Sequence, residues 1–207
     1  MPFVFFGTVF VTEATDNLFS TNHNIALMDK QTLRDLLKTA SSLLDKNGLS
    51  EGTFTDRKGT QYHYYTGVIT PQDDTIFVFG SNPEGRHGRG EKAGSSGVAV
   101  REFGAIKGVG EGLQGSSYAI PTKDLRVRRN NGDRSISPEQ ITESIRKMYE
   151  KARQMPDKKF KVAYHNGADK VTRCGYTGLE LVKMFLAHPV PDNVYFSHAW
   201  RKIIEEL

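Results

Sequence analysis

From residue 75 to the end of the chain, short apolar runs alternate with segments whose apolar residues recur at helical spacing. The first run, TIFVFG (75–80), is apolar at successive positions, which is typical of a strand buried on both faces of a sheet. Alternating strands and helices predict an α/β fold, here a three-layer sandwich around a mixed, largely parallel sheet. The predicted strands are 75–80, 117–120, 159–166 and 193–197, and the predicted helices are 95–103, 138–154, 175–188 and 198–207.

The helix predicted at 138–154 has the clearest start signal in the sequence. Ser137 is a favourable N-cap, Pro138 suits the first helical position, and Gln140 completes a capping box. These signals fix where the helix begins independently of its apolar pattern.

The chain before residue 70 follows a different pattern. Residues 3–12 are rich in Phe and Val and predict a strand, while leucines at helical spacing between Asp29 and Asn47 predict a helix. Two β-prone runs then flank the turn DRKG (56–59), which predicts a hairpin. Because 207 residues favour one domain, we interpret residues 1–70 as an elaboration packed on the α/β domain at 71–207.

Composition limits the compartment and the kind of partner. The net charge of +4 and the pI of about 9.1 are compatible with phosphate-bearing partners without marking a nucleic-acid binder. The single cysteine, Cys174, excludes a disulfide within the chain and favours a reducing compartment. The apolar N-terminus lacks a basic leader and nothing reaches transmembrane length, so we expect a cytoplasmic protein without membrane contact. No cluster has metal-ligand spacing, so we expect no metal and no cofactor.

Three glycine-bearing loops follow or flank the predicted strands, at 80–90, 108–124 and 165–178. In open α/β sheets, ligands bind beyond the carboxyl ends of the strands, and helix N-termini there suit phosphate. If the sheet is parallel, the three loops meet at one edge, which favours a phosphate or nucleotide site. The first loop lacks the spacing of a Rossmann or P-loop motif, and a plain surface loop with solvated cations is the alternative.

Two motifs then resemble a known family: FGSNPEGRHGRG (79–90) and GLQGSSYAIPTKD (112–124). With the late CGYTG loop (174–178), the order of elements resembles the macro-domain superfamily, whose members bind ADP-ribose and its derivatives. The match is closer to an uncharacterised group of bacterial and phage proteins that share FGSNxxGxHGxG and GLxGxSYAIPTKD, and it covers about residues 75–200. It implies a protein of a bacterial or phage-infected cell that binds ADP-ribose or a related nucleotide diphosphate. Hydrolysis of that ligand or of an ADP-ribosyl conjugate stays open.

The resemblance also implies ligand contacts, position by position. Asn82 takes the place of the macro-domain Asn at the distal ribose, residues 174–178 would wrap the diphosphate, and Tyr176 would lie near the ribose. The chain departs from the macro pattern at 88–100, where an Ala-rich helix start is replaced, and at 164–178, which is longer and more polar. The expected ligand-binding set is Gly80, Ser81, Asn82, Gly85, Gly88, Gly90, Asn166, Gly167, Cys174, Gly175, Tyr176, Thr177 and Gly178.

Three residues are candidates for catalysis. His87 is a candidate general base or phosphate donor, with a loop histidine bonded to backbone as the equal alternative. Lys123 and Asp124 are adjacent past one strand, where a Lys and an Asp on one rim would serve covalent or acid–base chemistry; a surface pair is the commoner outcome. Cys174 has no evident base beside it and is expected to be structural.

A second hypothesis is a non-enzymatic binding module for a host protein or a nucleic acid. The basic segment 123–134 has five cations and two aspartates, and residues 62–65 offer aromatic rings that would stack bases. A solvated loop and a packed strand face are the alternatives for these two segments.

Overall fold

The computed structural model describes residues 51–88, 94–128 and 133–207, together with Thr32, Asp35 and Thr39. The strand predicted at 3–12 and most of the helix predicted after Asp29 lie outside the described residues, as do Gly90 and the turn at 131–132. Among the described residues, no helix is long and apolar enough to cross a membrane.

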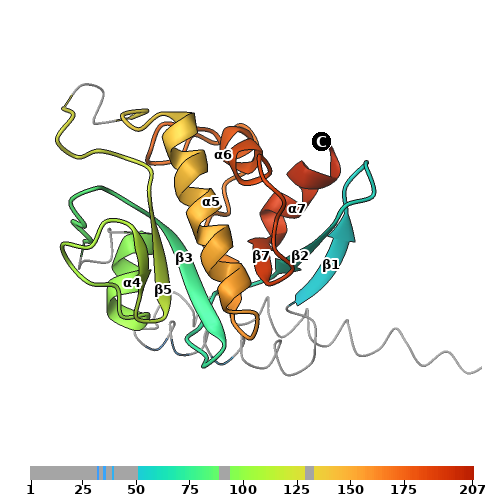
Figure 1. The fold of residues 1–207 in the computed structure, drawn as a ribbon, viewed down its shortest axis with the longest axis horizontal. Coiled ribbons are helices and arrows are strands. Elements are labelled where there is room, and N and C mark those ends of the chain that lie inside the picture. The colour runs from blue at the N-terminus through green and yellow to red at the C-terminus, as the bar shows by residue number, and fades with distance from the viewer. Residues whose placement is uncertain (1–31, 33–34, 36–38, 40–50, 89–93, 129–132) are drawn as a thin grey trace, which may run out of the picture.

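Seven strands of the described part of the chain form one sheet in the spatial order β1-β2-β7-β6-β3-β5-β4 (Figure 1). The pairs β2–β7, β7–β6, β6–β3 and β3–β5 are parallel, and the outer pairs β1–β2 and β5–β4 are antiparallel. The sheet is therefore mixed and largely parallel, as predicted. Its strands are β1 (Glu51–Thr55), β2 (Gln61–Tyr65), β3 (Thr75–Ser81), β4 (Gly112–Gln114), β5 (Ser117–Pro121), β6 (Lys159–Val162) and β7 (Val194–Ser197).

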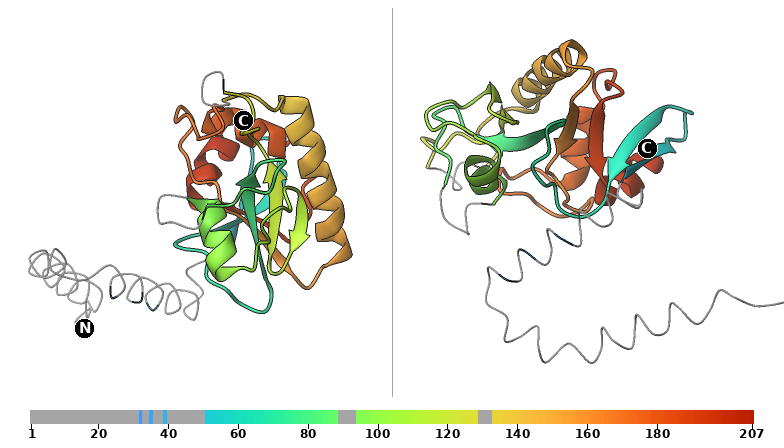
Figure 2. Two further views of the ribbon diagram at one scale, coloured as in Figure 1. Left: turned by 90° about the vertical axis from the view of Figure 1, so that its left-hand side faces the viewer. Right: turned by 90° about the horizontal axis from the view of Figure 1, so that it is seen from below.

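Within the ranges 51–88, 94–128 and 133–207, four helices cover both faces of this sheet, an arrangement compatible with the expected three-layer sandwich. Helix α4 (Ser95–Glu102) packs on one face, and α5 (Pro138–Gln154), α6 (Gly178–Phe185) and α7 (His198–Glu205) pack on the other. Figure 2 shows α4 and α5 on opposite sides of the central strands.

Strand β3 explains why the sequence IFVF (76–79) is apolar at every position. Ile76 and Val78 belong to the large core beneath α5, α6 and α7, whereas Phe77 and Phe79 belong to the smaller core beneath α4. Successive side chains of a strand point to opposite faces, so a strand covered on both sides needs apolar residues at odd and even positions.

Local signals place the helix starts. Ser137 accepts a hydrogen bond from the Gln140 amide and the Gln140 side chain accepts one from the Ser137 amide, so the predicted capping box of α5 is confirmed. Helix α6 starts with a second such box, between Thr177 and Glu180, which was not predicted. The box explains why α6 begins at Gly178, three residues later than predicted.

The predicted hairpin is present and joins the main sheet. β1 and β2 pair antiparallel around the turn at 56–59, and β2 pairs in parallel with β7. Strand β4 was interpreted as loop because three residues, Gly112–Gln114, are too few to show a periodic pattern; pairing with β5 makes them a strand.

Candidate functional site

The chain reverses its direction across the sheet between β3 and β6. These strands are parallel neighbours, but β3 leads through α4 to β5 on one side, whereas β6 leads through α6 to β7 on the other. Connections that diverge in this way leave a crevice at the carboxyl ends of the two strands, which is where ligands bind in open α/β sheets.

A cavity of about 470 Å³ lies at these carboxyl ends, and we call it the cationic cavity. Arg86, Lys123 and Arg173 line it, and none of its described lining residues is an Asp or Glu. The remaining lining residues are Gly80, Ser81, Asn82, Gly94, Ser95, Ser96, Thr122, Leu125, Ala163, Tyr164, His165, Asn166, Val171, Thr172 and Cys174. All three sequence loops therefore contribute, as the predicted convergence required.

The start of α4 forms one wall of the cationic cavity. Gly94 is the N-cap with a φ of 63°, a left-handed conformation that glycine adopts without strain, and it supplies no side-chain cap. Ser95 and Ser96 follow and also line the cavity. The partial positive charge of a helix start adds to the field of the three cations.

Asn82 is held by its own loop. Its Nδ2 donates to the carbonyl oxygen of Arg86 at 3.1 Å, and its Oδ1 accepts from the Arg86 amide at 2.9 Å. The side chain is buried yet lines the cavity, so it closes the loop and places Arg86 at the cavity mouth. A direct ribose contact, as the resemblance implies, would have to share these two bonds.

The glycines of the first loop serve close packing. A Cβ at Gly80 would overlap the Tyr164 hydroxyl, and a Cβ at Gly85, whose φ is 60°, would overlap the backbone of Val109. Gly88 is described but does not line the cavity. Gly80 therefore allows Tyr164 to reach the cavity floor, and Gly85 joins this loop to the loop before β4.

His87 lies away from the cationic cavity. It is 3% exposed, its ring meets Phe79 edge-on, and its Nε2 lies 3.0 Å from the carbonyl oxygen of Val109. A carbonyl only accepts, so Nε2 is the protonated nitrogen, and the buried Nδ1 has no described hydrogen-bond partner. Burial lowers the pKa of His87, which keeps the ring neutral. The structure thus gives His87 the alternative role considered above, a loop histidine bonded to backbone.

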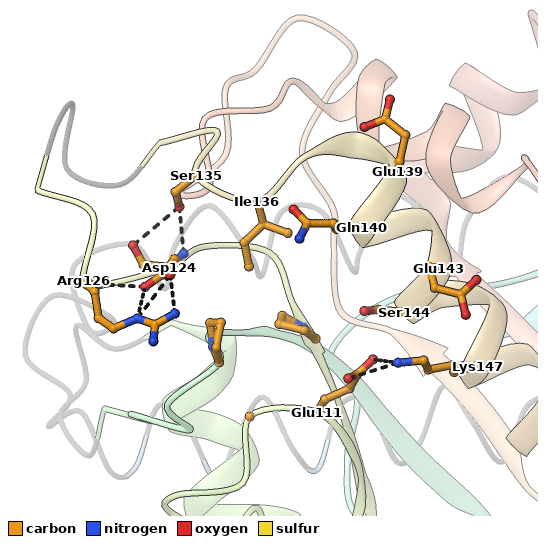
Figure 3. A pocket seen from close by; sticks show the side chains of 13 residues that line it. Glu111, Asp124, Arg126, Ser135, Ile136, Glu139, Gln140, Glu143, Ser144 and Lys147 are labelled. Atoms are coloured by element: carbon orange, nitrogen blue, oxygen red, sulfur yellow. Dashed lines mark hydrogen bonds and ion pairs between the residues drawn. The ribbon is translucent and has the colours of Figure 1, made fainter.

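Lys123 and Asp124 point to different places. Lys123 lines the cationic cavity, and its Nζ donates to the Arg173 carbonyl at 2.9 Å and to Asp133, which is not a lining residue, at 3.0 Å. Asp124 instead lines a second cavity, where the Arg126 guanidinium donates to its carboxylate at 2.7 Å (Figure 3). Hydrogen bonds from Arg126 lower the pKa of Asp124 to about 2. The two residues do not form an acid–base pair in one site.

The amides at the start of α6 are already bonded, contrary to the expectation that they hold a diphosphate. Gly178 donates to Lys170 O at 3.1 Å, Leu179 to Ala168 O at 3.0 Å, and the Glu180 amide to the Thr177 hydroxyl at 3.2 Å. A Cβ at Gly178 would overlap the Gly167 carbonyl oxygen, so the backbone at 166–167 covers this helix start. No donor remains there for an outside anion among these three amides.

The rest of the CGYTG loop is structural, except for Cys174. Tyr176 is buried, donates through its hydroxyl to Ile136 O at 2.8 Å, and has the Arg134 guanidinium 4.7 Å from its ring centroid. Gly175 has a φ of 87°, and a Cβ there would lie 2.7 Å from the Asp133 Cβ. Cys174 is buried and lines the cavity, with its Sγ 3.0 Å from the Thr172 hydroxyl.

The end of β6 supplies two polar side chains, one predicted and one missed. Asn166 lines the cavity as predicted, and its carbonyl oxygen accepts a hydrogen bond from Trp200 Nε1 at 3.2 Å. Gly167, which was also predicted, is exposed and does not line the cavity. Tyr164, which was not predicted, stacks on Trp200 and lies 3.4 Å from the Thr122 hydroxyl through its own hydroxyl. Burial raises the pKa of Tyr164, so the phenol stays a donor. Its position two residues past a strand was the available signal.

The features that favoured nucleic acid are mostly engaged elsewhere. Tyr65 is buried and donates to Val162 O at 2.8 Å, and Tyr62 packs against Phe54 and Phe196. In the basic segment 123–134, Arg126 is tied to Asp124 and Glu84, and 129–132 lie outside the described residues. No group of three metal-ligating side chains occurs within the described ranges.

The chain matches no protein-family model, and no curated protein is significantly similar to it. The resemblance to macro domains therefore stays a prediction that rests on the motifs.

Proposed function

We propose that the chain binds ADP-ribose or a related nucleotide diphosphate in the cationic cavity. The observation that carries this proposal is the charge of its lining at the point where the sheet connections diverge: no described lining residue is a carboxylate, and of the three lining cations Lys123 is paired with Asp133 from outside the lining. Opposite charges placed on low-dielectric walls attract more strongly than in bulk water. A diphosphate, which carries negative charge at neutral pH, complements this lining.

The neutral part of the lining suits the sugar. Thr122, Tyr164 and Asn166 place hydroxyl and amide groups beside the cations, where the hydroxyls of a ribose need partners. The volume of about 470 Å³ lies within the range typical of small-molecule sites. The phosphates would lie between Arg86, Arg173 and the start of α4, which differs from the α6 position implied by the resemblance.

Among the described residues, the same lining offers few groups for hydrolysis. General-base catalysis on a phosphate or glycosyl bond needs a carboxylate or a neutral imidazole within hydrogen-bond reach of water. Asp124 and His87 point elsewhere, so among the described lining residues the exposed His165 is the imidazole that could reach such a water; the other titratable lining groups are the three cations, the half-buried Tyr164 and the buried Cys174.

Calorimetric titration with ADP-ribose, ADP, AMP and adenosine tests the proposal. We expect affinity to fall along that series, with adenosine the weakest because it carries no phosphate. Arg86→Ala should weaken ADP-ribose binding about tenfold, the size typical of a lost charge-assisted hydrogen bond. Arg128→Ala is the matched control, because Arg128 is exposed and does not line the cavity. Equal loss in both variants, or no heat with any nucleotide, would overturn the proposal.

A gel shift separates the nucleic-acid alternative. Binding to a phosphate backbone weakens steeply with salt in proportion to the contacts made. We expect little retention of a short oligonucleotide at physiological salt. Retention that depends on Arg128 more than on Arg86, with no nucleotide binding, would favour that alternative.

A further inference from the structure

A second cavity, of about 640 Å³, lies on the other side of the segment 121–126, between this segment and α5. Figure 3 shows the side chains of α5 along one side of it and Asp124 with Arg126 on the opposite side. Pro83, Pro121 and Ile136 give it apolar walls. We call this cavity the acidic groove, for the charges described next.

Carboxylates outnumber cations around the acidic groove. Glu111, Asp124, Glu139 and Glu143 line it together with only two cations, Arg126 and Lys147. Both cations are already paired with lining carboxylates: Lys147 with Glu111 at 3.2 Å and Arg126 with Asp124 at 2.7 Å. The groove therefore keeps a negative charge although the whole chain has a net charge of +4.

The uncompensated charge lies on the first turns of α5. Glu139 forms no ion pair with any described residue, and a hydrogen bond from Ser137 lowers its pKa, which keeps it ionised. Glu143 pairs with Arg146 at 2.7 Å, but Arg146 also pairs with Glu150, so one cation serves two carboxylates. These two positions, four residues apart, lie on one side of the helix.

The shape of the groove fits an extended segment of polypeptide. From Glu139 to Lys147, the lining of α5 extends about 12 Å, the length of three or four extended residues. The apolar walls suit the methylene stems of Arg and Lys, which pack on apolar surface while their charged ends reach polar groups. Gln140 and Ser144 add polar groups along the same side.

We propose that the acidic groove docks a basic segment of a partner protein. The guanidinium or ammonium groups of the segment pair with Glu139 and Glu143, and their stems lie against Ile136 and the two prolines. This site uses none of the residues that line the cationic cavity. The proposal therefore goes beyond nucleotide binding and is tested independently of it.

Fluorescence anisotropy with a labelled eight-residue peptide containing four arginines tests this proposal. The matched probe is the same peptide with citrulline at the four positions, which keeps the shape and removes the charge. We expect saturable binding of the arginine peptide, at least tenfold weaker binding of the citrulline peptide, and no displacement by excess ADP-ribose. Equal affinity for the two peptides, or no binding of either, would overturn the proposal.

Variants then locate the binding site on the protein. Glu139→Gln with Glu143→Gln should weaken arginine-peptide binding about tenfold. The matched control is Asp157→Asn with Glu206→Gln, which removes the same charge from exposed residues that do not line the groove. Each glutamate variant is also made singly, and amide shifts of Ser135, Gln140 and Ser144 on peptide addition give a readout in the unaltered protein. Equal loss in the control, or shifts confined to other residues, refutes the site.

Discussion

The cationic cavity and the acidic groove are opposite in charge but share one wall. Thr122, Lys123 and Leu125 line the cationic cavity, whereas Pro121, Asp124 and Arg126 line the acidic groove. The direction in which each side chain leaves this short segment decides which site it serves. Lys123 and Asp124 are adjacent in sequence but line different cavities. Adjacency in a loop is therefore weak support for a joint catalytic role.

The largest effect is expected at Gly175, which supports both sites. A side chain there adopts a strained positive φ and meets Asp133, the partner of Lys123, close to the Ser135 and Ile136 wall of the groove. Gly175→Ala should cost about 2–4 kcal/mol of unfolding free energy, the sum of the cost of a left-handed conformation and that of an overlap with Asp133.

The control for Gly175→Ala is Gly167→Ala in the same loop, where the nearest atom to a new Cβ is the Lys170 Cγ at 3.9 Å. We expect a change under about 0.5 kcal/mol there, measured by urea unfolding. Similar losses at both positions would contradict the packing argument. A substitution at Gly175 is therefore a poor probe of ligand contact, because it disturbs the fold.

Asn82→Ala should affect the cationic cavity alone. It removes two hydrogen bonds to the backbone of Arg86 in a buried loop, which should cost about 1–2 kcal/mol of stability without ligand and about tenfold in ADP-ribose affinity. Thermal unfolding of the ligand-free variant separates this loop role from a direct ribose contact. An unchanged midpoint with weakened binding would favour the direct contact, and arginine-peptide binding serves as the control.

A smaller, pH-dependent effect is expected at His87, which joins the loops that border the two sites. Burial places the folded-state pKa below the ordinary value of 6.5, so the unfolded chain binds more protons in the interval between the two values. The stability contributed by neutral His87 is full above about pH 6.5 and is lost as the pH falls toward the lowered pKa. His87→Gln should flatten this acid-side slope in urea unfolding. An identical slope in both proteins would show that other groups cause it.

The smallest effect on nucleotide binding is expected for Asp124→Asn, which tests whether the two sites are independent. Asp124→Asn should leave ADP-ribose affinity within about twofold, because Asp124 lies on the groove side of the shared wall. The same change should weaken arginine-peptide binding by more than twofold. It removes a carboxylate from the groove and frees Arg126 from one of its two carboxylates. A large loss of nucleotide affinity would show that the two sites are not separate.

Much of the candidate site followed from strand ends. The expected ligand-binding set included Gly80, Ser81, Asn82, Asn166 and Cys174, and the cavity contains all five. Tyr176 and His87 were assigned from motif position and residue type, but their side chains turn into the fold. Tyr164 was missed although it lies two residues past a strand. Arg173 and the two serines that open α4 were missed because no single-residue pattern distinguishes them from ordinary loop residues.

The sequence by itself determined the order of the main strands and helices, the mixed sheet and the start of α5. These depend on interactions between near neighbours, such as the capping box at Ser137, and on apolar periodicity. Only the tertiary structure decided which loop atoms stay available for a ligand. The α6 amides are bonded to Lys170, Ala168 and Thr177, and Lys123 and Asp124 face different cavities. Those outcomes depend on contacts between segments far apart in the chain and on the direction of single side chains, which local patterns do not encode.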